Sequence, residues 1–355
     1  MINVLLGRRV ISNNSKPYII AEIGVNHEGS FDQAIKLIDL AKKGGADAVK
    51  FQSYKANTLA SKNSPAYWDK SKEPTSSQHE LFKKYDSFNE GEYTALSKYC
   101  NNIGIEFLST PFDDDSIDFL DSLMPFYKIA SADLTNLPLL RKVAKKNKPI
   151  VLSTGASTLG EIDVAIEILR TNNCNEIVLL HCILNYPTND NNANLSMISN
   201  LKKTYPEYVI GYSDHTLPDE NMTSLVTSYL LGAKVIEKHF THDKLLPGND
   251  HYHSMDVNDL KNFKSILKKV DILKGNENIK KPIATESISR LNARRSIVLV
   301  KNVEAGHVLT ELDLICKRPG TGISPLYWDE VIGCVVLSSI KEDSTLQWND
   351  LQKKI

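Results

Sequence analysis

The chain has 355 residues, and its 42 Lys and Arg residues almost balance its 43 Asp and Glu residues, giving a formal net charge of −1. This balance argues against a nucleic-acid partner, and no apolar run approaches the roughly 18 residues that a membrane span requires. The five cysteines form no C-x-x-C pair, and the N-terminal segment has too short an apolar stretch for a secretion signal. We therefore expect a cytoplasmic α/β enzyme with reduced thiols.

Eight short apolar runs recur along the first 240 residues, and most of them end in a polar residue. Segments with helical periodicity separate the runs; the first spans 31–41 and follows Ser30, a suitable N-cap. Strands that alternate with helices eight times predict a (β/α)8 TIM barrel, whose active site forms at the carboxyl ends of the strands. The predicted strands lie at 18–24, 48–52, 106–111, 127–131, 149–154, 177–182, 209–214 and 235–240.

Polar side chains at the ends of these strands should converge on one mouth of the barrel. They are Glu22, Lys50, Gln52, Thr110, Lys128, Ser131, Ser153, His181, Ser213, His215 and His239. The connection over 53–88 is much longer than an ordinary loop and carries Trp68 and several tyrosines, so we expect it to cover the same mouth.

The composition changes after residue 274 to a polar stretch without periodicity. We therefore predict a barrel over 1–280, a linker over 281–290 and a second domain over 291–355. This second domain contains a weak repeat, in which Val303, Leu309, Asp313 and Leu314 are matched by Ile340, Leu346, Asp350 and Leu351 at a constant offset of 37. Two copies of one strand–turn–strand unit would build a small β-domain, although four matching positions can also arise by chance.

Two histidines follow neighbouring strands of the predicted barrel. His215 lies in GYSDHT and His239 in IEKHFT, so their imidazoles can reach one metal ion while leaving positions open for water and substrate. With oxygen ligands, imidazole suits Mn²⁺, Zn²⁺, Co²⁺ or Fe²⁺. His242, His251 and His253 lie in the following loop, and we expect them to face substrate or solvent.

Two lysines lie inside otherwise apolar strands. Because an unpaired ammonium is costly to bury, Lys50 and Lys128 must pair with an anion, or one of them has a lowered pKa and forms a Schiff base. A structural ion pair with Glu22 or Glu237 is one alternative. The hydroxyls that end other strands favour an anion site for phosphate and carboxylate. Glu22 and Asp250 are further candidates, as a base or as partners of a sugar hydroxyl.

In chain order, AEIGVNHEG, VKFQ, LSTPF, YKIAS, LSTG, HCxxxYPT, GYSDHT, EKHFT and KRPGTG resemble the motifs of the sialic acid synthase family. The resemblance covers nearly the whole chain. It implies a (β/α)8 barrel followed by a small antifreeze-like (SAF, β-clip) domain. It also implies a transferase that condenses phosphoenolpyruvate with an N-acyl hexosamine, such as N-acetylmannosamine, to give a nine-carbon 2-keto acid and phosphate.

The resemblance also assigns residue roles. It implies Mn²⁺ or Mg²⁺ on His215 and His239, and an arginine, Arg318, that reaches the barrel of a partner in a domain-swapped homodimer. The positions matching phosphoenolpyruvate-binding residues are Lys50, Thr110, Lys128, Ser131, Ser153 and Ser213. Those near the acyl sugar or the reacting centre are Glu22, Gln52, Asp133, Tyr186 and Asp250.

The sequence departs from the N-acetylneuraminate pattern on the sugar side. Leu184 stands where some members have an asparagine, and His251 and His253 follow Asp250 where those enzymes have less polar residues. The resemblance therefore implies that the sugar is N-acetylmannosamine or its 2,4-diacetamido-2,4,6-trideoxy relative; the second would make the product a legionaminate. Two rival interpretations are a Schiff-base aldolase on the same barrel and a C-terminal domain that binds carbohydrate or ice on its own.

Overall fold

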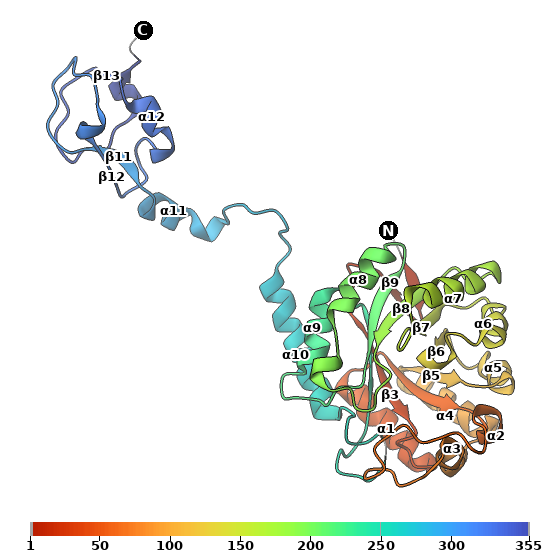
Figure 1. The fold of residues 1–355 in the computed structure, drawn as a ribbon. Coiled ribbons are helices and arrows are strands. Elements are labelled where there is room, and N and C mark those ends of the chain that lie inside the picture. The colour runs from red at the N-terminus through yellow and green to blue at the C-terminus, as the bar shows by residue number, and fades with distance from the viewer. Residues whose placement is uncertain (1–2, 249, 354–355) are drawn as a thin grey trace. The chain divides into compact units, whose positions relative to one another are not determined.

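The computed structural model describes residues 3–248 and 250–353, and the chain divides into two compact units, Met1–Lys274 and Gly275–Ile355 (Figure 1). No helix in the described part of the chain is both long and apolar enough to cross a bilayer.

The first unit is built on one parallel sheet of eight strands. Their order is β5-β4-β3-β10-β9-β8-β7-β6, and the two end strands of this order also lie against each other, which closes the sheet into a barrel. The strands are β3 (Tyr18–Gly24), β4 (Ala48–Ser53), β5 (Glu106–Pro111), β6 (Tyr127–Ile129), β7 (Ile150–Ser153), β8 (Ile177–Cys182), β9 (Val209–Asp214) and β10 (Val235–His239). The predicted (β/α)8 barrel is confirmed.

Eight helices surround these strands (Figure 1). They are α1 (Phe31–Gly44), α4 (Glu90–Ile103), α5 (Asp114–Leu120), α6 (Leu137–Ala144), α7 (Leu159–Thr171), α8 (Ser196–Thr204), α9 (Thr223–Leu231) and α10 (Val257–Lys274). Side-chain caps fix where several of them begin: Ser30 accepts a hydrogen bond from the backbone of Gln33, and Asn89 and Thr158 form capping boxes.

A short hairpin precedes the barrel and was not predicted. Its strands β1 (Val4–Leu6) and β2 (Arg9–Ile11) pair antiparallel, and Leu6 and Ile11 are fully buried. The guanidinium of Arg9 lies 2.6 Å from the carboxylate of Asp47, which precedes β4, so the hairpin lies near the amino ends of the strands. Three-residue strands carry too little periodicity to be recognised in the sequence.

The long connection after β4 is not an open loop. It contains α2 (Ala56–Leu59) and α3 (Gln78–Tyr85), and an ion pair of 2.8 Å between Lys55 and Asp86 ties its two ends together. Its Trp68 indole donates a hydrogen bond to the Glu73 carbonyl. We refer to residues 53–88 as the covering segment.

The second unit begins with a polar stretch that carries η3 (Ala284–Glu286) and α11 (Ser287–Ala293), where the sequence predicted a linker without periodicity. Two antiparallel pairs follow: β11 (Ser296–Leu299) with β12 (Leu314–Lys317), and β13 (Val335–Val336) with β14 (Leu351–Gln352). A short helix, α12 (Trp328–Val331), precedes β13.

The predicted repeat in this unit is confirmed. η4 (Glu311–Asp313) before β12 corresponds to η6 (Trp348–Asp350) before β14. Val303 and Ile340, which occupy equivalent positions of the two copies, exchange a pair of backbone hydrogen bonds of 2.9 Å. The copies are therefore joined through the same position of each, as a pseudo-twofold relation requires. Leu309 and Leu346, another equivalent pair, are buried in the shared core.

Candidate active site

Strand register decides which side chains face the interior of the barrel. Side chains that lie opposite each other on neighbouring strands share a face, and faces alternate along each strand. Glu22 is paired in register with both Lys50 and His239, and Ser213 with Glu237. These polar side chains therefore come together at the carboxyl ends of their strands, as the sequence predicted.

The same alternation removes His181 from the site. His181 is in register with Tyr212, its ring stacks on that tyrosine at 5.6 Å, and its Nε2 lies 2.9 Å from the carbonyl of Ala193. The following residue, Cys182, shares the face of Ser213 instead. The expectation that His181 joins the converging set is wrong, because one residue along a strand reverses the face.

Lys50 is held by a carboxylate and a hydroxyl. Its Nζ lies 2.5 Å from Oε2 of Glu22 and donates a hydrogen bond of 2.9 Å to Thr110. Gln52 donates to the other oxygen of Glu22 at 3.0 Å. Burial raises the pKa of Glu22 to about 7 against the opposing effect of Lys50, while Glu22 and Glu237 outweigh burial and raise the pKa of Lys50.

Glu237 lies between the two lysines of the site, although the sequence analysis named it only as an alternative ion-pair partner. Its Oε1 lies 3.4 Å from Nζ of Lys128 and 4.0 Å from Nζ of Lys50, and it accepts a hydrogen bond of 3.1 Å from Ser213. Burial by itself would raise the pKa of Glu237, but the two lysines lower it. Burial lowers the pKa of Lys128. Two ammoniums and two carboxylates thus alternate in a buried network.

The hydroxyls predicted to bind an anion lie around this network. Ser153 is buried, and its Oγ has no hydrogen-bond partner within the protein. Ser131 is buried and accepts a hydrogen bond of 2.8 Å from the backbone of Gly155. An unpaired buried hydroxyl is costly, so Ser153 is available to a ligand.

His215 and His239 lie together at the same mouth, with ring centroids 5.5 Å apart. Nδ1 of His215 lies 2.9 Å from the carbonyl oxygen of Ile183, an arrangement that leaves Nε2 with a lone pair. Nδ1 of His239 is buried without a hydrogen-bond partner and lies 3.6 Å from Oδ2 of Asp250. Burial lowers the pKa of His215 to about 4 and holds that of His239 well below its usual value, so both rings are neutral, as metal ligands must be.

These features fit a divalent ion bound by two imidazoles with water or substrate completing the coordination. Among the residues that the structure describes, no three His, Cys, Asp or Glu side chains form a metal cage by themselves. His251 and His253 are buried rather than solvated. His251 lines the cavity described below, as expected of a residue that faces substrate, and its Nδ1 lies 2.8 Å from the hydroxyl of Thr241.

A cavity of about 560 Å³ opens beside this centre. Of the predicted residues, Gln52, Ser131, Asp133, Tyr186, His239 and Asp250 line it. The covering segment supplies much of the wall, through Leu59, Tyr67, Leu81, Phe82 and Tyr85 among others, so its expected position over the mouth is confirmed. Tyr186 packs its ring 4.1 Å from that of His215. Burial raises the pKa of Asp133, which accepts a hydrogen bond from Asn136.

Arg318 belongs to the second unit, directly after β12, and its side chain is exposed. The predicted role of Arg318 in a partner's barrel stays a prediction.

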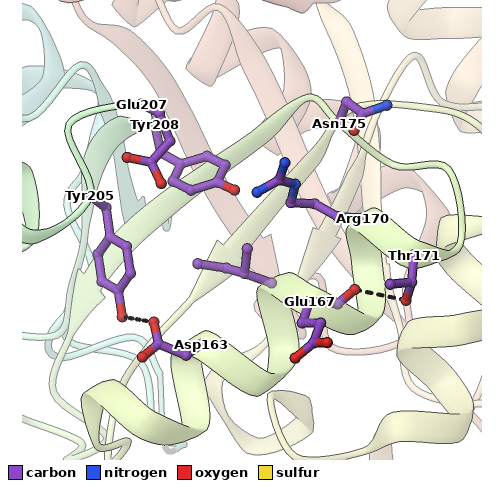
Figure 2. A pocket seen from close by; sticks show the side chains of 9 residues that line it. Asp163, Glu167, Arg170, Thr171, Asn175, Tyr205, Glu207 and Tyr208 are labelled. Carbon is purple, nitrogen blue, oxygen red and sulfur yellow. Dashed lines mark hydrogen bonds between the residues drawn. The ribbon is translucent and has the colours of Figure 1, made fainter.

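A second pocket lies between α7 and the segment that leads into β9 (Figure 2). Tyr205 donates a hydrogen bond of 2.8 Å to Asp163 there, and Arg170 and Tyr208 line the same hollow. It is near the amino ends of β8 and β9, away from the strand ends that carry chemistry in this fold. We assign it no catalytic role.

Taken together, the fold and the site define a barrel enzyme with an ion-pair network and a histidine pair at the carboxyl ends of its strands. The NeuB family model matches residues 37–279, and the SAF domain model matches residues 294–352. The chain therefore belongs to the NeuB family. The predicted family, fold and enzymatic nature are confirmed.

Individual relatives cover nearly the whole chain. It is 41% identical to the N,N'-diacetyllegionaminic acid synthase of Legionella pneumophila over 94% of both chains. It is 40% identical to the enzyme of the same name from Campylobacter jejuni, over 94% of this chain and 99% of that one. Other relatives are named pseudaminic acid synthase and N-acetylneuraminate-9-phosphate synthase.

The fold also matches a solved structure, the N-acetylneuraminic acid synthetase of Leptospira borgpetersenii. The TM-score is 0.71 at 32% identity, over 81% of this chain and 94% of that one.

Proposed function

We propose that this enzyme condenses phosphoenolpyruvate with an N-acyl hexose to give a nine-carbon 2-keto acid and inorganic phosphate. The observation that carries the proposal is the meeting of two buried ammoniums, Lys50 and Lys128, with the histidine pair at one barrel mouth. An anionic substrate and an electrophile that needs polarisation are the reactants such a site accommodates.

The charges of Lys50 and Lys128, where the anionic substrate would bind, are already balanced by Glu22 and Glu237. Phosphoenolpyruvate brings a phosphate and a carboxylate, which would exchange places with these carboxylates as partners of the lysines. The hydroxyls of Thr110, Ser153 and Ser213 add neutral donors to the same ligand. The free Oγ of Ser153 supports this assignment.

The histidine end would hold the divalent ion, Mn²⁺ or Mg²⁺ in this proposal. Bound there by His215 and His239, the ion would supply Lewis-acid polarisation of the sugar aldehyde. Asp250 faces Nδ1 of His239 and would hold that ring in the orientation that leaves its Nε2 for the ion.

In the reaction, the electron pair of the C2–C3 double bond of phosphoenolpyruvate forms a bond from C3 to the aldehyde carbon, whose oxygen becomes a hydroxyl, and water adds at C2. The bond between C2 and the phosphate oxygen then breaks, which releases inorganic phosphate and leaves the 2-keto group. Glu22, which accepts a hydrogen bond from Gln52, is placed to orient the water, take its proton and pass that proton to the sugar oxygen that was the aldehyde. Lys128 offsets charge on the departing phosphate.

For the sugar, the cavity wall favours the 2,4-diacetamido-2,4,6-trideoxy hexose over N-acetylmannosamine. Phe82, Phe112 and Leu184 line the cavity, and such apolar groups suit a C6 methyl and acyl methyls better than hydroxyls. The described lining includes two carboxylates, Asp133 and Asp250, and no lysine or arginine, which disfavours a phosphorylated sugar.

The test is phosphate release from phosphoenolpyruvate with Mn²⁺ and a panel of acyl sugars, in the wild type and in His239→Ala. We expect release with an acyl sugar and its loss in the variant. Failure of every sugar to stimulate release, or an unimpaired variant, would refute the proposal.

A Schiff-base aldolase is the remaining catalytic alternative, and the lowered pKa of Lys128 is the one observation that favours it. Borohydride in the presence of pyruvate would trap a covalent adduct on Lys128 in that case. The synthase should give none.

We also propose that the enzyme acts in the cytoplasm as a domain-swapped homodimer, in which Arg318 reaches the sugar in the partner's barrel. The family resemblance of KRPGTG and the exposure of Arg318 support this assignment.

A further inference from the structure

His253 is the buried group near the proposed metal centre that has no role in the mechanism above. It lies in the segment between β10 and α10, its side chain has no exposed surface, and both ring nitrogens lack a hydrogen-bond partner within the protein. A buried, unsatisfied imidazole costs free energy, so its retention needs a reason.

Asp250 connects His253 to the histidine pair. Its Oδ2 lies 3.6 Å from Nδ1 of His239, and its Oδ1 lies 3.6 Å from Nε2 of His253. One carboxylate therefore stands between two imidazoles. Burial would raise the pKa of Asp250, but the neighbouring imidazoles lower it below its usual range.

The two proposed ligands have matching surroundings. In His215 the backbone carbonyl of Ile183 occupies the Nδ1 side, and in His239 the carboxylate of Asp250 does. A backbone carbonyl is fixed by the fold, but a carboxylate can rotate. Oδ1 of Asp250 faces Nε2 of His253, so a hydrogen-bond donor at that nitrogen would help to fix the direction of Oδ2 toward His239.

Packing holds His253 in place for this purpose. Its ring lies edge-to-face on His239, with centroids 4.9 Å apart and an interplanar angle of 78°. It lies edge-to-face on Tyr252 as well, at 5.2 Å and 89°. These contacts restrict the direction of the ring, and hence of Nε2.

We propose that His253 is a positioning residue of the metal centre, whose Nε2 closes the 3.6 Å separation from Oδ1 of Asp250 and donates a hydrogen bond to it when the ion is bound. By holding that oxygen it keeps Oδ2 directed at Nδ1 of His239 and leaves Nε2 of His239 free for the ion. The inference rests on the proposed metal site, and it extends that site by a residue outside the histidine pair.

The test measures Mn²⁺ binding by the full-length protein, with calorimetry for affinity and electron paramagnetic resonance for the ion's surroundings. His253→Phe keeps the ring volume but removes the donor, and His253→Gln keeps a donor. Loss of such an outer partner typically costs about 10- to 100-fold in metal affinity. We expect that loss in His253→Phe, near-wild-type affinity in His253→Gln, and no change in the control His242→Ala.

Unchanged Mn²⁺ affinity in a folded His253→Phe variant, with binding abolished in His239→Ala, would overturn the inference and leave the proposed function intact. Should the resonance spectrum show one imidazole nitrogen fewer in His253→Phe, His253 would be a direct ligand, and the positioning role would be wrong. Absence of Mn²⁺ binding by the wild type would remove both the inference and the proposed metal site.

Discussion

Nζ of Lys128 lies 3.4 Å from Oε1 of Glu237, and both side chains are more than nine-tenths buried. Glu237 also faces Lys50, which in turn contacts Glu22. The four groups carry no net charge together when all are ionised. Phosphoenolpyruvate, which brings a carboxylate and a phosphate, would therefore compete with Glu22 and Glu237 for the same two ammoniums.

Lys128→Met should weaken phosphoenolpyruvate binding by roughly 10- to 100-fold, the effect of losing one charge-assisted hydrogen bond. Calorimetric titration of the full-length protein with phosphoenolpyruvate measures it. Lys142→Met, which removes a lysine from a partly exposed ion pair with Asp118, is the control. Equal affinity in the wild type and Lys128→Met would exclude Lys128 from the anion site.

Glu237→Gln should act in the opposite direction. Removing the carboxylate leaves the network with one excess positive charge, so phosphoenolpyruvate should bind about 3- to 10-fold more tightly while the free protein melts at a lower temperature. Glu106→Gln, at the amino end of β5 and beside the exposed Arg8, should change neither quantity. Weaker binding in Glu237→Gln would mean that Glu237 contacts the ligand through a hydrogen bond that glutamine does not replace.

Most residues of this site could be predicted from sequence because they lie at the carboxyl ends of strands. The apolar runs located β3 and β9 to the residue, and the positions of Glu22 and Ser213 at their ends then followed from the fold. His181 was misplaced because position at a strand end does not reveal the face, which depends on register with a neighbour.

Other features depend on contacts that no local pattern encodes. Glu237 shares the inward face with His239 two residues later. Its position between Lys50 and Lys128 depends on closure of the barrel, because β4, β6 and β10 are not neighbours in the sheet. His253 lies in a loop without periodicity, so its complete burial could be seen only in the folded chain.

The ion pair of Asp214 and Lys238 should matter for stability because, as in the lysine–glutamate network, each buried charge compensates the other. Both side chains are fully buried, and the charged atoms are 2.6 Å apart. Lys238→Met leaves a buried carboxylate uncompensated and should cost about 3–5 kcal/mol in the free energy of unfolding, measured by urea denaturation. Adding Asp214→Asn should recover part of the loss. A cost no larger than the ~1 kcal/mol typical of exposed ion pairs would contradict this.

His27 should make stability fall at mildly acidic pH. Burial lowers its pKa from 6.5 to about 4, and its ring stacks on Phe88 at 4.2 Å. Between these two pH values the unfolded chain therefore binds more protons than the folded chain. The contribution of His27 to the free energy of unfolding is fully present above pH 6.5 and declines as the pH falls toward 4, by up to about 3 kcal/mol. Urea midpoints should decline less steeply in His27→Gln than in the wild type over this range. Parallel declines would show that His27 is not the group responsible, and His79→Gln serves as the matched control.

Arg318 offers a test of the proposed dimer that does not depend on which sugar is used. If the guanidinium serves the barrel of the other protomer, Arg318→Ala and His239→Ala each inactivate a homodimer for a different reason. A mixed dimer then has one barrel with an intact His239 that also receives Arg318 from its partner. Mixing the two inactive proteins under conditions that allow subunit exchange should restore phosphate release. An arginine that serves its own barrel predicts no recovery, because each protomer would lack one of the two residues. Arg295→Ala, which removes an arginine from the same unit, is the control for general damage, and it should stay active alone.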